Sequence, residues 1–313
     1  MTALPSPAAR PAALLVVVVA LLAPARAVQA QPAQSTLQAQ SARAPERSTR
    51  VSLRSRMGLA ESPFPSADAH KISGLLTSLL LEGEAPVAPA LAVRLRLPLV
   101  LADIDEPAGA ARSENAWGHP EAAVLWRVRE TAAASLLGRL ALAVPLPGGD
   151  AALARRPLDN QVLVLASAQR GYHDQELYAP GRVALTPSAR IAASRGRVDV
   201  FGELKLPLML AVGLGDVDPR TKVRRLAIAS AAAAGAAVSW WRLRAGATLW
   251  SVVDVIQAAE IRGAAARRWT LTIDPEVSMR ITDHVGAGLT ATIPVAGALS
   301  ALPAIGFVVT GAW

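Results

Sequence analysis

The sequence predicts an all-β fold, a closed antiparallel transmembrane β-barrel of about 12 strands. Three observations lead to this prediction: apolar and polar residues alternate along much of the chain, the alternating segments are roughly 10 to 16 residues long, and few helix-like stretches separate them. Successive side chains of a strand point to opposite faces, so each segment has one apolar and one polar side. A barrel in lipid needs strands of about 9–11 residues that are apolar outward, and its closure pairs every backbone group.

The first 30 residues have the pattern of a secretory signal peptide. Arg10 precedes an uninterrupted apolar run over residues 12–23, and a loose small-x-small cleavage pattern ends at Ala30. The run is too short for the ~20 residues that a membrane-spanning helix needs. The expected organisation is a signal peptide (1–30), a flexible periplasmic lead-in (31–49) and the barrel (50–313).

The candidate strands follow from the alternation, taken in order along the chain. The clearest is 267–282, where Trp269 and Leu271 fall on one face while Thr270 and Thr272 fall on the other. The thirteen candidates are 50–61, 71–82, 89–103, 120–130, 134–147, 160–170, 182–194, 198–213, 224–239, 242–255, 267–282, 284–295 and 303–313.

One of these candidates must be wrong, because a single-chain bacterial barrel has an even number of strands. Successive strands of a barrel must run alternately up and down. Assigning these directions from either end of the chain is consistent until the segment 160–170 (NQVLVLASAQR). We therefore expect twelve strands. The segment 160–170 lies either inside a long outer loop over 148–181 or beside a second strand that the pattern does not show.

Four proline-centred tripeptides support this order. Each falls late in a strand that the count makes ascending, and proline belongs at strand ends, edges or bulges because it has no N–H for the ladder. The tripeptides are Leu97-Pro98-Leu99, Val144-Pro145-Leu146, Leu206-Pro207-Leu208 and Ile293-Pro294-Val295.

Composition excludes several classes of protein. The 313 residues include no cysteine, which excludes disulfide scaffolds and cysteine-based metal or iron–sulfur sites. Only 18% of the residues are charged and 52% are apolar, which is little charge for a surface that meets water all round. The net charge of +8 comes mainly from dispersed arginines, so nucleic-acid binding is not expected. A soluble exported β-sandwich stays open as the alternative fold, since its half-buried strands also alternate.

No motif in the sequence predicts catalysis, a metal site or a cofactor. The four histidines are spread along the chain without metal-ligand spacing. His173 and Asp174 lie in a predicted loop, and Asp283 and His284 lie in a predicted tight turn; we interpret both pairs as solvated. The chain is therefore not expected to be an enzyme.

The C-terminal strand resembles that of a known family. Phe307, Val309 and Trp313 share one face, and the last residue is aromatic. In this the chain resembles bacterial outer-membrane β-barrel proteins. The resemblance implies an outer-membrane location, contact with its lipid, and recognition of Phe307, Val309 and Trp313 by the barrel assembly machinery. The "LPL" and "IPVAG" turns are also similar to outer-membrane transporters of the phenol-degradation (MetA-pathway) type, a match with no catalytic or ligand motif.

The polar faces of the strands suggest a channel. A ring of guanidinium groups in an open lumen favours anions, so we expect a passive, weakly anion-preferring, porin-like channel for small solutes. The predicted lumen-lining residues are Arg94, Arg96, Arg127, Arg129, Arg139, Lys205, Arg242, Arg244 and Arg280, with Asp199, Glu203, Asp274 and Glu276.

Two alternatives to this channel stay open. The arginines could simply pair with the acidic residues inside a plugged barrel. The protein would then be a non-conducting structural barrel, or one whose loops at 104–119, 148–181 and 256–266 bind a surface partner.

Overall fold

The computed structural model describes residues 48–61, 73–105, 111–131, 134–146, 157–212, 226–256, 269–297 and 301–313. The predicted signal peptide and nearly all of the lead-in lie outside these residues. The strands are β1 (Arg50–Glu61), β2 (Ser73–Ala88), β3 (Leu91–Asp105), β4 (Ala111–Trp117), β5 (Glu121–Glu130), β6 (Ala134–Ala143), β7 (Arg182–Arg195), β8 (Val198–Lys205), β9 (Leu208–Ala211), β10 (Leu226–Trp240), β11 (Leu243–Ile256), β12 (Trp269–Arg280), β13 (Val285–Gly297) and β14 (Ala304–Ala312). Two helical elements, α2 (Pro157–Gln169) and the 3₁₀ turn η3 (Gln175–Leu177), stand between β6 and β7.

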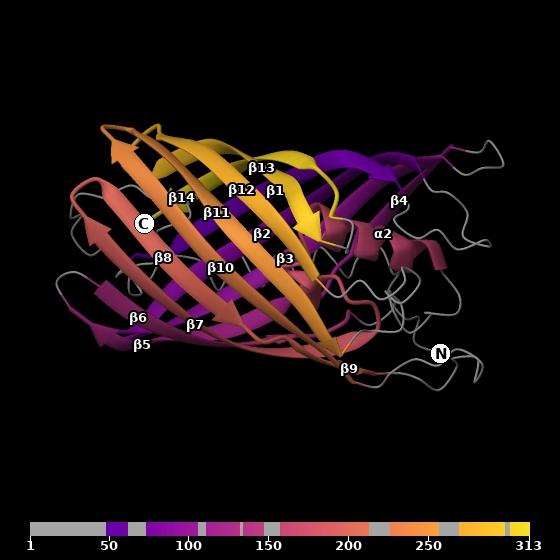
Figure 1. The fold of residues 1–313 in the computed structure, drawn as a ribbon, viewed down its shortest axis with the longest axis horizontal. Coiled ribbons are helices and arrows are strands. Elements are labelled where there is room, and N and C mark those ends of the chain that lie inside the picture. The colour runs from indigo at the N-terminus through magenta and orange to yellow at the C-terminus, as the bar shows by residue number, and fades with distance from the viewer. Residues whose placement is uncertain are drawn as a thin grey trace, which may run out of the picture. The chain divides into compact units, whose positions relative to one another are not determined.

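The described strands close into one ring (Figure 1). Each pairs antiparallel with the next, and β14 pairs with β1, so the first and last strands meet at a seam. β4 and β5 both pair with β3, and β8 and β9 both pair with β7 and β10, so each couple is one interrupted strand. The described residues therefore form a closed twelve-stranded antiparallel barrel, as the alternation predicts.

Prolines explain both interruptions. Pro98 of β3 faces the gap between β4 and β5, where Gly118 donates its backbone N–H to the Pro98 carbonyl at 3.1 Å. Pro207 lies between β8 and β9, and the adjacent Leu206 N–H donates to the carbonyl of Pro187 at 3.0 Å. A proline has no N–H for the ladder, so the pairing breaks locally while the strand continues on the same path.

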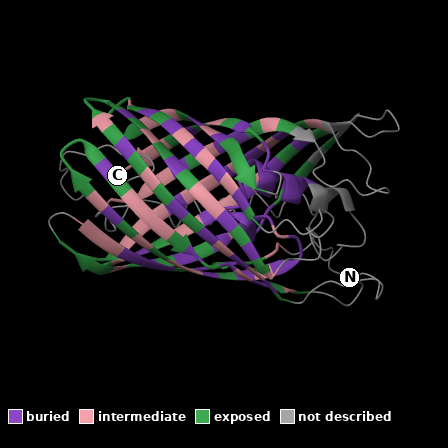
Figure 2. Cartoon of the chain, viewed as in Figure 1, coloured by how far each residue is buried: buried purple, intermediate pink, exposed green. Residues whose placement is uncertain are grey.

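The two faces of the wall differ in exposure, and Figure 2 shows buried residues alternating with intermediate and exposed ones along the strands. On β12, Thr270, Thr272 and Asp274 are buried inside the ring, whereas Val277 and Met279 are exposed on the outside. The predicted inward and outward faces of this strand are confirmed. The outer face of the barrel is thus apolar and the inner face largely polar.

Two segments differ from the sequence-based expectation. The candidate strand at 160–170 is wrong, because this stretch belongs to helix α2. It does lie within the predicted connection 148–181, so the first of the two alternatives holds. The expected loop at 104–119 contains β4, which extends the wall beside β3.

The two ends of the barrel are built differently. At one end lie the short connections β2–β3, β5–β6, β7–β8, β10–β11 and β12–β13, together with Arg50 and its partner Ala312. Thr49 and Trp313 exchange backbone hydrogen bonds of 2.9 Å there, which ties the last residue to the start of β1. We call this the turn end. The connection that carries α2 and η3 starts from the opposite end.

Candidate functional site: the charged interior and the inner segment

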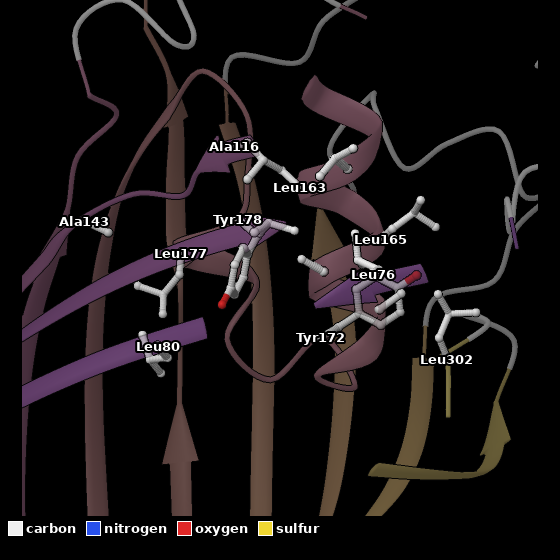
Figure 3. Close-up of a cluster of buried hydrophobic side chains, with 14 of the residues drawn as sticks. Leu76, Leu80, Ala116, Ala143, Leu163, Leu165, Tyr172, Leu177, Tyr178 and Leu302 are labelled. Carbon is white, nitrogen blue, oxygen red and sulfur yellow. The ribbon is translucent and has the colours of Figure 1, made fainter. Parts of the chain in front are cut away.

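Residues 157–181, here called the inner segment, lie against the inner face of the barrel wall. Every residue from Val162 to Tyr178 is buried. Figure 3 shows Leu163, Leu165 and Leu177 among wall side chains that include Leu76 and Leu80. An alanine-rich part of the wall belongs to the same cluster, because Ala227, Ala229 and Ala231 of β10 all face inward. Small wall side chains leave the room that this segment occupies.

Backbone groups join the inner segment to the wall on several sides. The Gln169 amide Nε2 donates to the carbonyls of Gly58 (3.2 Å) and Leu76 (3.1 Å), which belong to the paired strands β1 and β2. The His119 N–H donates to the Leu177 carbonyl at 2.7 Å. The Leu302 N–H, just before β14, donates to the carbonyl of Ala168 at 3.1 Å. These bonds supply partners to backbone carbonyls and N–H groups of mostly buried residues.

The turn after α2 needs glycine at one position. Gly171 has a φ of +61°, and a Cβ added there would lie 2.6 Å from Oγ1 of Thr272 on β12. The next residue, Tyr172, also has a positive φ (60°) and is buried. The chain thus reverses direction against the wall, and this reversal carries His173 and Asp174 into the interior.

Asp174 is the centre of an ion-pair cluster between the inner segment and the wall. Its carboxylate accepts hydrogen bonds from Arg96 of β3 (2.7 Å), from Arg170 of the segment (2.8 Å) and from Lys205 of β8 (3.3 Å). Burial alone would raise the pKa of Asp174, but the positive charges of Arg96 and Lys205 hold it well below its usual value. Asp174 is therefore ionised at neutral pH.

Two further carboxylates complete the cluster. Glu121 of β5 accepts hydrogen bonds from Arg139 of β6 and from Arg96. Glu176 of η3 lies 3.1 Å from the Lys205 ammonium. All of these side chains are nearly or fully buried. A buried charge is tolerated only with close partners, so the cluster fixes the inner segment against β3, β5, β6 and β8.

His173 makes an aromatic contact with the barrel wall. Its ring stacks on Trp250 of β11 with the ring centroids 4.5 Å apart and 11° between the planes. Burial lowers the pKa of His173 well below its usual value, so the imidazole is neutral. The prediction that His173 and Asp174 are solvated is wrong, because the turn after α2 places both inside the barrel.

The interior nearer the turn end is lined by separate ion pairs. Arg94 donates to Glu84 at 2.6 Å across the β2–β3 pair, and Arg190 donates to Glu203 at 3.1 Å across β7–β8. The Arg190 guanidinium also lies 3.8 Å above the Phe201 ring. Arg244 on β11 donates to Asp199 on β8 at 2.6 Å. A further pair lies beside the inner segment, where Arg56 on β1 donates to Asp274 on β12 at 3.2 Å.

The predicted lining residues fall into two groups. Most are buried or partly buried on the inner face, namely Arg94, Arg96, Arg127, Arg139, Asp199, Glu203, Lys205, Arg244, Asp274, Glu276 and Arg280. Arg129 and Arg242 are exposed at the turn end instead. A register shift between Arg127 and Arg129 breaks the alternation of β5, and Arg242 lies in the turn after β10, so neither follows the face of a regular strand.

The predicted assembly residues lie on the outer face. Phe307 and Val309 of β14 are exposed, and so is the terminal Trp313. Their outward orientation agrees with the predicted alternation of this strand. Their recognition by the barrel assembly machinery stays a prediction.

Several interior residues were not among the predicted ones. They are Arg56, Glu82, Glu84, Glu121, Arg170, Asp174, Glu176 and Arg190. A signal existed for two of them, because the β2–β3 hairpin places Glu84 opposite Arg94 and Glu82 opposite Arg96. Opposite charges at facing positions are a typical cross-strand pair. Asp174 and Glu176 had no such signal, since they meet the wall only through the path of the inner segment.

Metal-binding groups and membrane-spanning helices are both absent from the described residues. No group of three or more His, Cys, Asp or Glu side chains there is arranged to hold a metal ion. No helix in these parts of the chain is both long enough and apolar enough to cross a membrane.

Comparisons with known proteins identify the class of fold. No protein-family model and no curated protein matches the chain. Among solved structures, it is similar to the COG4313 outer membrane channel from Pseudomonas putida F1, with a TM-score of 0.57 and 10% identity over 87% of this chain and 97% of that chain. The KdgM porin gives a TM-score of 0.46 and 8% identity over 84% and 99% of the two chains. The first likeness shows the fold, which is that of an outer-membrane β-barrel.

Proposed function

We propose that the chain is an outer-membrane, porin-like channel for small solutes, in which the inner segment sets what can pass. One observation carries the proposal: a closed ring of described strands is apolar outside and lined inside by paired charges. A closed ring satisfies its backbone hydrogen bonds without water, so it can reside in lipid. The charged interior is costly to bury in a purely structural core, but it suits a path for water and polar solutes.

The short connections orient the barrel in the membrane. In outer-membrane barrels the short turns and both chain ends face the periplasm, and the longer loops face outward. The turn end therefore faces the periplasm, and the inner segment enters from the outer side. Export by residues 1–30 and recognition of Phe307, Val309 and Trp313 by the barrel assembly machinery belong to the same proposal.

The proposed channel has only a weak preference for anions over cations. Arg94, Arg96, Arg139 and Arg190 each lie beside at least one carboxylate, so their fields are largely cancelled. Only a small excess of positive potential can act on a passing ion, and its effect falls with ionic strength. The resemblance to phenol-degradation transporters adds small aromatic solutes as compounds to test.

A second function is favoured by the burial of the inner segment. Residues 162–178 are buried and joined to the wall on several sides. If this segment never leaves the wall, the barrel conducts nothing and serves as a structural or surface-interaction protein.

Planar-bilayer recording of the refolded full chain separates the two functions. The channel predicts discrete conductance steps, and a reversal potential slightly on the anion side in a KCl gradient. Uptake of phenol and benzoate by vesicles then tests the solute class. The sample is shown to be folded when its migration on a gel changes on heating. If such a folded sample gives no conductance steps at any voltage, the channel proposal is overturned and the non-conducting barrel remains.

A further inference from the structure

Exposed arginines lie on consecutive hairpins at the turn end of the barrel. Arg129 belongs to the β5–β6 hairpin, Arg195 and Arg197 to the β7–β8 hairpin and Arg242 to the β10–β11 hairpin, and all four are exposed. These hairpins are neighbours along the ring. We call the four residues the arginine arc. In contrast, the β2–β3 hairpin at the same end has the uncharged turn Val87-Ala88-Pro89-Ala90, so the arc is confined to one side of the rim.

Trp241, next to this arc, has a backbone conformation that its side chain disfavours. It has a φ of +54°, in the left-handed region where glycine is normal and a bulky residue is strained. Its side chain is 80% exposed, so no packing within the barrel compensates for the strain. The guanidinium of Arg242 lies 5.4 Å from the ring centroid. The two-residue turn between β10 and β11 needs a positive φ, which glycine would supply without strain. What the fold does not explain is a bulky, exposed tryptophan at this position, and this points to a contact outside the chain.

The surroundings of Trp241 place it at the edge of the apolar outer face. Trp240 precedes it and is 68% exposed, while Val238 and Leu243 are exposed on the outside of β10 and β11. Two tryptophans therefore stand where the apolar face ends and the arginines begin. Tryptophan is enriched at this depth in membranes because its ring is apolar and its N–H is polar.

We propose that the arginine arc, with Trp240 and Trp241, binds the phosphate headgroups of anionic phospholipids in the leaflet at the turn end. The inference rests on the proposed outer-membrane location. Guanidinium groups bind phosphate oxygens in a bidentate manner, and each basic residue near a membrane surface strengthens its attraction to anionic lipid about fivefold. The apolar face directly beside the arc favours a lipid over an acidic soluble protein, which would leave the tryptophans in water.

The test measures lipid selectivity of the full chain refolded into phosphatidylcholine vesicles. Spin-labelled phosphatidylglycerol and spin-labelled phosphatidylcholine report the fraction of each lipid that is immobilised on the barrel. We expect phosphatidylglycerol to be preferred at low salt, and the preference to shrink as salt is added. The variant R195Q/R197Q/R242Q should lose most of it, and the matched control R195K/R197K/R242K should keep most of it.

Trp241 supplies a second, independent variant. Trp241→Gly gives this turn the residue that its backbone favours, so the hairpin keeps its stability or gains some. We expect its heat-dependent gel migration to match or exceed that of the wild type, while its phosphatidylglycerol preference falls. A variant that keeps the full preference would show that the strained ring takes no part in lipid binding.

The outcomes separate this inference from the proposed function. Equal immobilisation of the two lipids on an inserted, heat-modifiable wild-type barrel would overturn the arginine arc as a lipid site and leave the channel untouched. A preference that survives in the glutamine variant would overturn it as well. A chain that does not insert into vesicles at all would instead overturn the outer-membrane proposal.

Discussion

Arg96 on strand β3 donates a hydrogen bond of 2.7 Å to Asp174 of the inner segment, 78 positions later in the chain. The bond joins the wall to the segment inside it. Arg96 also lies 3.5 Å from Glu121 on the adjacent strand β5, so wall and segment share one guanidinium. Movement of the inner segment away from β3 therefore has to break this contact.

Replacing Asp174 with asparagine should free the inner segment. The change leaves Arg96, Arg170 and Lys205 without their shared carboxylate, and breaking a buried ion pair costs roughly 3–5 kcal/mol. We expect more frequent or larger openings in bilayer recordings. Asp103→Asn is the control, because Asp103 is exposed and its carboxylate accepts a hydrogen bond from Ser113 on the neighbouring strand β4. Identical openings in D174N and wild type would show that the cluster does not hold the segment.

A reversible cross-link should close the barrel. A Cβ at Gly171 would lie 3.2 Å from the Cβ of Thr272, just below the roughly 3.5–4.5 Å span of a disulfide. The positive φ of Gly171 adds backbone strain of about 1–2 kcal/mol to this substitution, and replacing Thr272 removes the Oγ1 atom that a Cβ would approach most closely. The chain has no cysteine, so G171C/T272C would contain the only two thiols. We expect the oxidised variant to conduct little and its conductance to recover on reduction. The conductance of T272C alone should not change when the reductant is added. Conductance that is unchanged by oxidation would mean that the segment does not limit passage.

Opposite changes within one ion pair should move selectivity in opposite directions. Arg94→Gln leaves the carboxylates of Glu82 and Glu84 without this guanidinium, so the reversal potential should shift toward cations. Glu84→Gln leaves Arg94 in relative excess and should shift it toward anions. The two variants control for each other, since both remove one side of the same 2.6 Å contact. Shifts of the same sign, or none, would show that the pair does not line the path.

Stability should fall in mild acid through His173. Burial lowers its pKa in the folded barrel, so below about pH 6.5 the unfolded chain binds a proton that the folded barrel excludes. Each pH unit in that window then costs up to about 1.4 kcal/mol of the free energy of unfolding. Glu176, whose pKa burial raises, acts in the opposite direction, whereas Asp174 stays ionised.

The variant His173→Phe isolates the histidine in this pH dependence. Phenylalanine can keep the stack on Trp250 but cannot take up a proton. We therefore expect the heat-induced gel transition of wild type to drop more between pH 7.5 and pH 5 than that of H173F. Equal drops in the two proteins would assign the acid sensitivity to other groups.

The wall was predictable because an apolar outer face and a polar inner face impose a period of two on its strands. β12 shows why: Thr270, Thr272 and Asp274 face inward, and the alternation gives this directly. The interruptions near Pro98 and Pro207 follow from proline's missing N–H, so they too have a local cause.

The inner segment could not be predicted in the same way. A helix buried on all sides has no polar face, and a short apolar run such as Val162 to Ala166 has no period that distinguishes it from a buried strand. Asp174 and Lys205 meet only because a turn near Gly171 reverses the chain inside the ring. Such a contact depends on a path in three dimensions and leaves no mark in local sequence.

The seam between β1 and β14 has a consequence for how the molecule is put together. The inner segment stands midway along the chain, yet Gln169 is bonded to Gly58 near the start and Ala168 to Leu302 near the end. Its neighbours thus come from both sides of the seam, and the last of them is synthesised more than a hundred residues after the segment itself. An incomplete barrel provides only some of the hydrogen bonds that hold the inner segment. Closure of the barrel and packing of the inner segment are therefore a single cooperative event.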